Sequence, residues 1–203
     1  MSFPIVVLVS GEGTNLQALI DQVHGRDVDI VGVAASRAEA RGLERARAAG
    51  IETAAFAIAD YPDRPARDAA LADWIEGRGA RLVVLAGFME LLGPEFIARF
   101  RNAIVNVHPA LLPAFPGVHA IEQALDYGVK VSGVTVHFVD EGVDSGAIIL
   151  QRPFELPYPR DIAAIETVIH QIEHELLPEA VRLIAQGRVR IDPDEPRWVI
   201  VDE

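Results

Sequence analysis

The sequence contains no cysteine, and this absence excludes a disulfide framework, a thiolate metal site and a cysteine nucleophile. It fits a protein of the reducing cytoplasm. Positive charge is also scarce, because 18 lysines and arginines stand against 30 aspartates and glutamates, for a net charge of -12. Since binding to a nucleic-acid backbone needs clustered lysine and arginine, we expect no nucleic-acid partner.

Long hydrophobic runs are missing as well. The longest, at residues 82–89, is too short to cross a bilayer, and no basic leader precedes the N-terminal apolar run, unlike in a signal peptide. We therefore expect no membrane partner and a cytoplasmic location. The chain has 203 residues, 50% of them hydrophobic, so it can bury a sizeable core. Without repeats, low-complexity segments or linkers, we expect one domain over residues 1–203.

Apolar runs rich in β-branched residues alternate with segments of helical spacing, which predicts a parallel sheet with right-handed crossovers. Two later extended segments predict an antiparallel addition, and a long helical pattern follows, broken or bent near Pro178. The expected fold is single-domain α/β, with a Rossmann-like, mostly parallel twisted sheet, helices on both faces and an antiparallel C-terminal addition. We expect strands at residues 4–10, 30–36, 51–58, 81–87, 103–108, 131–139 and 147–154, and helices at 16–23, 38–49, 65–77, 94–100, 120–127 and 161–186.

The segment SGEGTN, residues 10–15, joins the first expected strand to the first helix. Its two glycines match a dinucleotide-binding fingerprint, but Leu16 occupies the third glycine position and no acidic residue closes the second strand. The lysine of a P-loop is missing too. What remains is a tight loop whose backbone N–H groups can hold one phosphate, or a plain turn with Thr14 or Asn15 as the helix N-cap.

The most distinctive segment is NVHPALLPAFPG, residues 106–117. Its three prolines predict a stiff, irregular loop, in which Leu112–Pro113 is a candidate cis peptide although trans is the commoner form. Asn106 and His108 stand at its entrance, two residues apart on an extended segment, so both point to the same face. At the carboxyl end of a parallel strand, an amide and an imidazole can donate hydrogen bonds to an oxygen that gains negative charge.

An acid near His108 would favour its imidazolium form. The segment VDEGVDSGA offers three acids, of which Asp144 is favoured because a Ser-Gly pair that suits a tight turn follows it. The alternative is that His108 caps the strand end and Asp144 bonds to its own backbone. Without a serine nucleophile elbow or a cysteine, the chemistry that fits is acyl transfer by direct attack of an amine, with stabilisation of the tetrahedral oxyanion.

These motifs resemble those of the folate-dependent formyltransferases. The Asn-x-His-Pro segment and the later aspartate are shared across that superfamily, and the order and spacing of SGEGTNLQ, LAGFME, NVHPALLPAFPG, VHFVDEGVDSG and IEHELLP are similar to those of the phosphoribosylglycinamide formyltransferases, or glycinamide ribonucleotide transformylases. The resemblance covers nearly the whole chain. It implies transfer of a formyl group from 10-formyltetrahydrofolate to the amine of glycinamide ribonucleotide in purine synthesis, without a metal. A homodimer is left open.

The resemblance also implies catalytic roles. His108 would stabilise the oxyanion as imidazolium or deliver a proton, and Asn106 would donate a second hydrogen bond. Asp144 would raise the pKa of His108, orient the ring and relay the amine proton through water. Residues 1–100 would form a nucleotide-phosphate half, and residues 101–203 a folate and catalytic half.

Binding contacts follow from the same resemblance. Gly13, Thr14 and Asn15 would hold the substrate phosphate, and Glu173 would face the ribose. Glu90 departs from relatives, which can carry a basic residue at that position. The folate would lie between LAGFMELL and the loop at 140–144, against Arg64, Leu85, Met89, Glu90, Leu91, Leu92, Ile104, Val139 and Asp140.

Other interpretations stay open. A formyltetrahydrofolate hydrolase would use the same three catalytic residues with water as the acceptor, and would carry an extra N-terminal regulatory domain. A methionyl-tRNA formyltransferase would need a further, basic C-terminal domain. A phosphate- or nucleotide-binding module without catalysis would explain the glycine loop alone.

The remaining histidines carry weaker signals. His170, Glu173 and His174 match the H-x-x-E-H metalloprotease pattern, but no third ligand is identifiable, and we expect no metal. His119 follows the proline-rich loop closely enough to line the site. His137 lies in an alternating strand, where we expect a structural role.

Overall fold

The computed structural model describes residues 2–157 and 161–202. The chain forms two compact units, Met1–Asn106 and Val107–Glu203. The boundary between them falls within strand β5 (Ile104–His108). The first unit carries a set of parallel strands, and the second carries an antiparallel pair.

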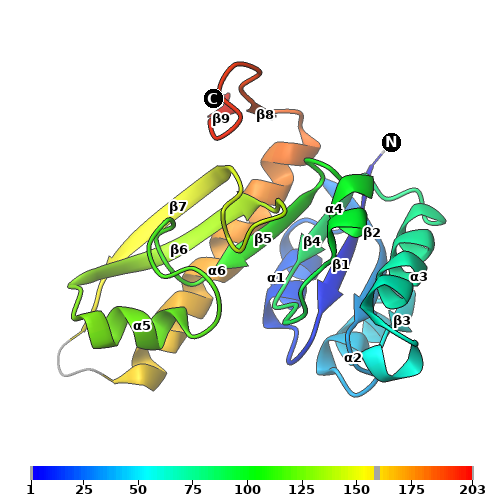
Figure 1. The fold of residues 1–203 in the computed structure, drawn as a ribbon, viewed down its shortest axis with the longest axis horizontal. Helices are drawn as coiled ribbons and strands as arrows, with labels where there is room; N and C mark the ends of the chain where they lie inside the picture. The colour runs from blue at the N-terminus through cyan, green and yellow to red at the C-terminus, as the bar shows by residue number, and fades with distance from the viewer. Residues whose placement is uncertain (1, 158–160, 203) are drawn as a thin grey trace. The chain divides into compact units, whose positions relative to one another are not determined.

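The first unit is a parallel sheet with the strand order β3-β2-β1-β4-β5. In β1 the residues from Ile5 to Val9 are 0% exposed, as expected of a central strand covered on both faces. Helices α1 and α3 lie on opposite sides of the strands (Figure 1). The elements are β1 (Phe3–Val9), α1 (Thr14–Gln22), β2 (Val28–Ala35), α2 (Arg41–Ala48), β3 (Thr53–Ala55), the 3-10 helix η1 (Ile58–Asp60), α3 (Arg64–Glu76), β4 (Leu82–Leu85), α4 (Pro94–Arg99) and the start of β5.

The chain reverses its direction across the sheet between β1 and β4. From β1 it proceeds through β2 to β3, and it then returns by α3 to β4 on the other side of β1. The loops that leave the carboxyl ends of β1 and β4 meet here, and Ser10 N–H donates a 3.0 Å hydrogen bond to the Gly87 carbonyl. In open α/β sheets such a switch point is where ligands bind.

The second unit is built on two antiparallel strands, both of which contact the long helix α6 (Figure 1). Strand β6 is buried along its length except at Val131, its first residue. The elements of this unit are α5 (Ala120–Tyr127), β6 (Val131–Phe138), β7 (Ile148–Glu155), α6 (Ile162–Ala185) and the small pair β8 (Val189–Ile191) and β9 (Val199–Val201).

The strand order of the main sheet is β3-β2-β1-β4-β5-β6-β7, with β1 to β5 parallel and β7 antiparallel to β6. The predicted α/β fold, with a mostly parallel sheet and an antiparallel C-terminal addition, is therefore confirmed. Within residues 2–157 and 161–202, no helix has the length and apolar character needed to cross a membrane.

The helical pattern predicts a break or a bend near Pro178, and no break occurs there, since α6 is continuous from Ile162 to Ala185. Buried apolar residues flank the proline on both sides, including Leu176, Leu177 and Val181. Burying three such side chains stabilises by several kcal/mol, at roughly 1.5–3 kcal/mol each. That packing outweighs the cost of roughly 3 kcal/mol that an interior proline imposes on a helix.

Candidate active site

Gly13 shapes the loop between β1 and α1. It is the N-cap of α1 with a φ of 71°, so neither Thr14 nor Asn15 is the cap that the plain-turn interpretation required. A Cβ at this position would lie 2.5 Å from the Cα of Gly42. The left-handed backbone and the close approach of α2 both require glycine here.

Contacts from α2 hold the same loop. Arg45 Nε donates to the Glu12 carbonyl at 2.8 Å, and Arg41 Nη1 pairs with the Glu12 carboxylate at 2.8 Å. Gly42 N–H donates to the Gly11 carbonyl at 3.1 Å. Among the described residues, no side chain caps the start of α1. A glycine loop fixed at a helix N-terminus in this way suits an anion such as a phosphate.

The loop after β4 carries four of the predicted folate contacts. Met89 and Leu91 are 78% and 64% exposed, whereas Glu90 and Leu92 are half-buried. The hydroxyl of Ser10 accepts a hydrogen bond from Met89 N–H at 2.8 Å. The glycine loop and the loop after β4 are therefore joined at the switch point of the first unit.

The other predicted folate contacts of the first unit lie in regular elements. Arg64 begins α3 and is exposed, and its Nη1 donates to the Leu91 carbonyl at 3.3 Å. Leu85 and Ile104 lie on β4 and β5 and are 7% and 0% exposed. Their side chains belong to the core beneath the loops in this structure.

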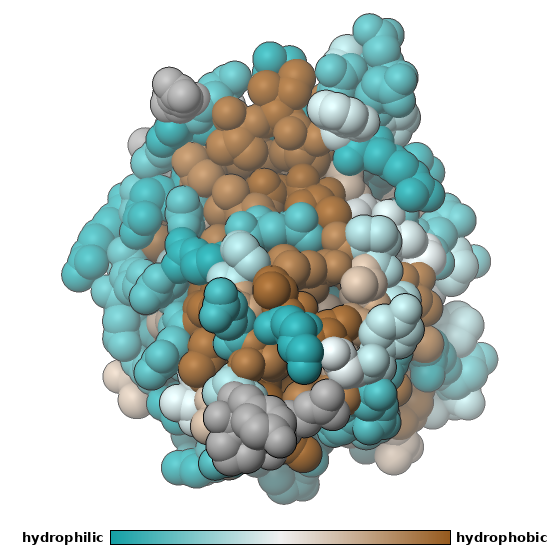
Figure 2. All heavy atoms as spheres, turned by 90° about the vertical axis from the view of Figure 1, so that its left-hand side faces the viewer, coloured by the Kyte–Doolittle hydropathy of each residue, from teal (hydrophilic) through white to brown (hydrophobic). Residues whose placement is uncertain are grey.

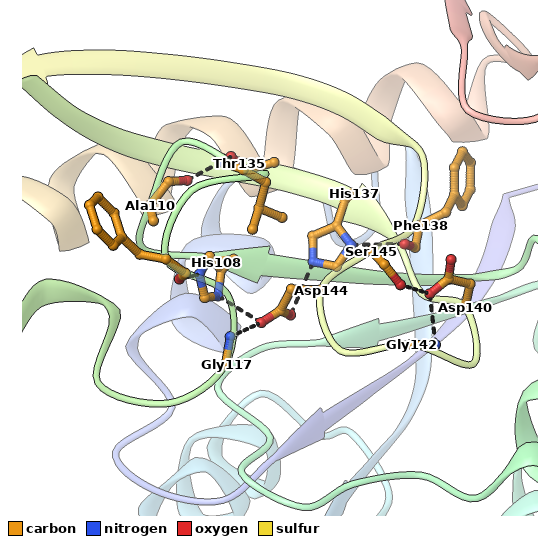
Figure 3. A network of polar contacts seen from close by, with 12 residues as sticks. His108, Ala110, Gly117, Thr135, His137, Phe138, Asp140, Gly142, Asp144 and Ser145 are labelled. Carbon is orange, nitrogen blue, oxygen red and sulfur yellow. Dashed lines mark hydrogen bonds and ion pairs between the residues drawn. The ribbon is translucent and has the colours of Figure 1, made fainter. Parts of the chain in front are cut away.

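His108 and Asp144 come together in the second unit (Figure 3). His108 Nδ1 lies 3.3 Å from Asp144 Oδ2, and His108 Nε2 donates to the Phe115 carbonyl at 2.8 Å. Asp144 adopts a φ of 48° in its turn, and its Oδ2 also accepts from Gly117 N–H at 2.7 Å. The carboxylate is therefore fixed by a loop amide as well as by the histidine.

His137 completes this network. It is 1% exposed, its Nε2 lies 3.5 Å from Asp144 Oδ1, and its Nδ1 donates to the Phe138 carbonyl at 2.8 Å. Each carboxylate oxygen thus faces one imidazole, and each imidazole bonds a backbone carbonyl through its other nitrogen. The sequence predicted only a structural role for His137 and did not predict its contact with Asp144. The available signal was the polar pair Thr135 and His137, which share one face of a strand.

Thr135 ties the proline-rich loop to β6. Its hydroxyl is fully buried, donates to the Ala110 carbonyl at 2.6 Å and accepts from Leu112 N–H at 3.1 Å. Gln151 Nε2 donates to the same hydroxyl at 2.9 Å. The loop contains a cis peptide at Leu112–Pro113, so the less common form holds. These bonds hold the segment that follows His108 in a fixed path.

Competing effects set the charges of the pair. Burial disfavours the Asp144 carboxylate, but hydrogen bonds from His137 and Gly117 and the positive charge of nearby imidazolium lower its pKa from 3.8 to about 2. Burial lowers the pKa of His108 below 6.5, although the Asp144 carboxylate acts to raise it. Asp144 therefore acts on the pKa of His108 in the expected direction, but desolvation of the ring outweighs this attraction and the net shift is downward. Both ring nitrogens of His108 face acceptors, the Phe115 carbonyl and Asp144 Oδ2, so the geometry favours the imidazolium form that burial disfavours.

The other predicted residues have separate settings. Asn106 is the last residue of the first unit, half-buried on β5, and Glu173 is 6% exposed on α6. Val139 is half-buried after β6, and Asp140 is exposed. Asp140 Oδ1 accepts from Gly142 N–H at 3.0 Å, which closes the turn before Asp144.

The histidines of the metalloprotease-like pattern stack on each other. The ring centroids of His170 and His174 are 6.3 Å apart and nearly parallel. In the described part of the chain, no three histidine, aspartate or glutamate side chains are grouped to hold a metal ion. His119, the N-cap of α5 with a φ of 61°, is exposed and lies 3.5 Å from Glu122.

Figure 2 shows a broad apolar patch on the face where α5, β6 and β7 are drawn. The second unit also has a hollow of about 420 Å³, bounded by the proline-rich loop, α5 and the start of β6. Its lining is mostly apolar, and the hydroxyls of Tyr127 and Ser132 are its polar side-chain groups. The lining residues are Leu111, Ala114, Phe115, Tyr127, Val129, Val131 and Ser132.

Comparison with known proteins places the chain in a family. Residues 3–181 match the family model described as formyl transferase. Phosphoribosylglycinamide formyltransferase of Haemophilus influenzae is 38% identical over 190 residues, covering 92% of this chain and 89% of that protein. Glycinamide ribonucleotide transformylase 1 of Symbiobacterium toebii has a crystal structure with a TM-score of 0.95 and 46% identity, covering 100% of this chain and 95% of that one.

Some relatives are much longer than this chain. Trifunctional purine biosynthetic protein adenosine-3 of Drosophila melanogaster is 41% identical over 194 residues, and these are 94% of this chain but 14% of that protein. The similarity to the shorter relatives, in contrast, extends over most of both partners. From the match of its sequence and of its fold, this chain belongs to the formyl transferase family.

Proposed function

We propose that this protein transfers a formyl group from 10-formyltetrahydrofolate to the amine of glycinamide ribonucleotide, a step of purine synthesis. The observation that carries the proposal is the contact of the buried His108, at the carboxyl end of a strand, with the half-buried Asp144, in a chain of the formyl transferase family. The names of the relatives that this chain covers over most of their length support glycinamide ribonucleotide as the acceptor. The donor is supported by the folate-dependent resemblance of the sequence motifs.

The proposed reaction is a direct acyl transfer. The amine nitrogen attacks the formyl carbon, and the carbonyl oxygen becomes an oxyanion that hydrogen bonds from Asn106 and His108 stabilise. One proton leaves the amine through water to Asp144, and a proton reaches N10 of the folate as the bond between the formyl carbon and N10 breaks. The products are the formylated nucleotide and tetrahydrofolate, so no oxidant or metal is required.

The geometry gives His108 a specific part in this scheme. Its Nε2–H already donates a hydrogen bond to the Phe115 carbonyl, and its Nδ1 faces Asp144. The ring can donate to an oxyanion only when Nε2 leaves or shares the Phe115 contact. Burial disfavours the imidazolium form of His108, whereas the acceptors that face its two ring nitrogens favour it. The negative charge of the oxyanion then favours the imidazolium, which Asp144 stabilises.

Substrate contacts are proposed on the same basis. Gly13, Thr14 and Asn15 would bind the phosphate at the start of α1, and Glu173 would face the ribose. The fixed glycine loop supports the first of these assignments. The proposed folate contacts are Arg64, Leu85, Met89, Glu90, Leu91, Leu92 and Ile104 in the first unit, and Val139 and Asp140 in the second.

Absorbance of 10-formyltetrahydrofolate, followed with and without glycinamide ribonucleotide, tests this function. Deformylation that requires the nucleotide is the expected result. Deformylation that proceeds equally well without it would instead indicate a hydrolase. If no deformylation occurs with or without the nucleotide, the proposed formyl transfer is refuted and a binding role is favoured.

A further inference from the structure

The loop at residues 86–93 has few apolar anchors of its own. Met89 and Leu91 point their side chains largely into solvent, at 78% and 64% exposure. The loop is nevertheless ordered by hydrogen bonds to its backbone from other elements, beginning with the Ser10 contacts to Gly87 and Met89. At its other end, the loop is held by the exposed Arg64, which donates to the Leu91 carbonyl, and by a buried ion pair on α3.

Arg67 and Asp68 form that pair. They are 0% and 4% exposed, and Arg67 Nε donates to Asp68 Oδ1 at 2.7 Å. Two oppositely charged neighbours on one helix, both withdrawn from water, are unusual because each loses its hydration. The polar atoms of the pair that are not used between Arg67 and Asp68 contact the backbone of the loop at residues 86–93.

The pair contacts the loop at three points. Arg67 Nη2 donates to the Leu91 carbonyl at 3.4 Å, and the guanidinium lies 6.0 Å from the centre of the Phe88 ring. Asp68 Oδ2 accepts from Gly93 N–H at 2.7 Å. A carbonyl, a ring and an amide of one loop are therefore fixed by two adjacent side chains.

This arrangement does not maximise stability. Arg67 Nη1 has no hydrogen-bond partner among the described residues although it is buried, and an unmet buried donor costs free energy. Buried ion pairs can often be replaced by apolar side chains without loss of stability. The contribution of this pair is therefore the conformation that it imposes on the loop.

We propose that Arg67 and Asp68 are positioning residues, which fix the loop at residues 86–93 in the conformation that binds the formyl donor. This inference rests on the proposed function, in which residues 89–92 contact the folate. The loop lies at the switch point of the sheet, where a ligand is expected. The pair holds the backbone on both sides of Leu92. Although the pair itself does not contact the donor, its removal would let the donor-binding residues of the loop move.

The test compares steady-state kinetics of the wild type with those of the double variant Arg67→Met/Asp68→Asn, which removes both charges and leaves no unpaired ion. We expect KM for 10-formyltetrahydrofolate to rise by about tenfold to a hundredfold, as for a displaced binding group. KM for glycinamide ribonucleotide stays within about twofold of the wild type. Amide hydrogen exchange becomes faster within residues 86–93.

Arg99→Gln is the matched control. Arg99, on α4, pairs with Asp73 and Glu76 of α3 at 2.7 and 2.6 Å, so it also links these two helices, but on the exposed surface and without a contact to the loop. We expect it to leave both KM values and the exchange of residues 86–93 unchanged. An equal rise of the donor KM in Arg99→Gln would overturn the inference, since helix docking would then explain the effect.

The outcomes separate this inference from the proposed function. A wild-type protein without formyl transfer refutes the proposed function itself. A wild-type protein that turns over, with a double variant of normal donor KM and unchanged exchange, refutes only the positioning role. If the double variant does not fold, Asp68→Asn alone carries the same expectation, with a smaller rise because Arg67 still donates to the Leu91 carbonyl.

Discussion

Replacing Asp144 by asparagine should lower the stability of the protein in a way that depends on pH. The carboxylate is 14% exposed, accepts from Gly117 N–H and lies between His108 and His137. Although burial acts to raise its pKa, these contacts lower it from 3.8 to about 2. At roughly 1.4 kcal/mol for each pKa unit, the ionised group contributes on the order of 2 kcal/mol, which Asp144→Asn removes at pH 7.

The direction of the pH dependence follows from the lowered pKa. The unfolded chain binds a proton at Asp144 before the folded protein does, so the stabilisation is fully present above about pH 4 to 5. It is lost as the pH falls through 3.8 toward 2. The difference in free energy of unfolding between wild type and Asp144→Asn should therefore shrink in acid.

Urea denaturation at pH 7, 5, 4 and 3, with about equal slopes for both proteins, measures this difference. We expect about 2 kcal/mol at the two higher pH values and a steady decrease below them. If the difference in free energy of unfolding between the two proteins does not change with pH, the reasoning is refuted. The lost stability would then come from altered packing or hydrogen bonding, and not from the charge of Asp144. An Asp144→Asn protein more stable than the wild type at pH 7 would refute it as well.

Three further predictions concern the same residues and the glycine loop. Asn106→Ala and His108→Ala should fold as the wild type does by circular dichroism but lose about a hundredfold to a thousandfold in kcat; near-normal turnover in either would contradict its role. An NMR titration of His108 should give a pKa below 6.5, and Asp144→Asn should lower it further because the carboxylate acts to raise it; an increase would reverse our assignment of charges. Gly13→Ala should destabilise by about 1–3 kcal/mol more than Gly25→Ala, since both have φ near 70° but a Cβ at Gly25 meets no described atom within 4 Å; equal costs in urea denaturation would exclude the close packing.

The parts of the site that the sequence predicted share one physical reason. Asn106 and His108 are two residues apart on a strand, where the side-chain direction repeats, and the prolines that follow exclude a regular element. Asp144 precedes a Ser-Gly pair and lies in a tight turn with a φ of 48°. The structure brings His108 and Asp144 together, whereas the catalytic role of Asn106 stays a prediction.

The parts that it missed depend on packing. His137 reaches Asp144 only because β6 is buried and the turn after it folds back toward the strand. The net pKa of His108 depends on how much water burial removes, which residue spacing does not report. The same holds for Arg67 and Asp68, two charges that a sequence pattern favours at the surface and that the fold buries beneath a loop.

The most direct test of the account follows an isotopically labelled formyl group through one turnover. We expect the label of 10-formyltetrahydrofolate to appear in the nucleotide amide with the wild type, and to stay almost entirely on the folate over the same time with His108→Ala. Label released as formate, with glycinamide ribonucleotide recovered unchanged, would contradict the account, because the amine would then not be the group that attacks the formyl carbon.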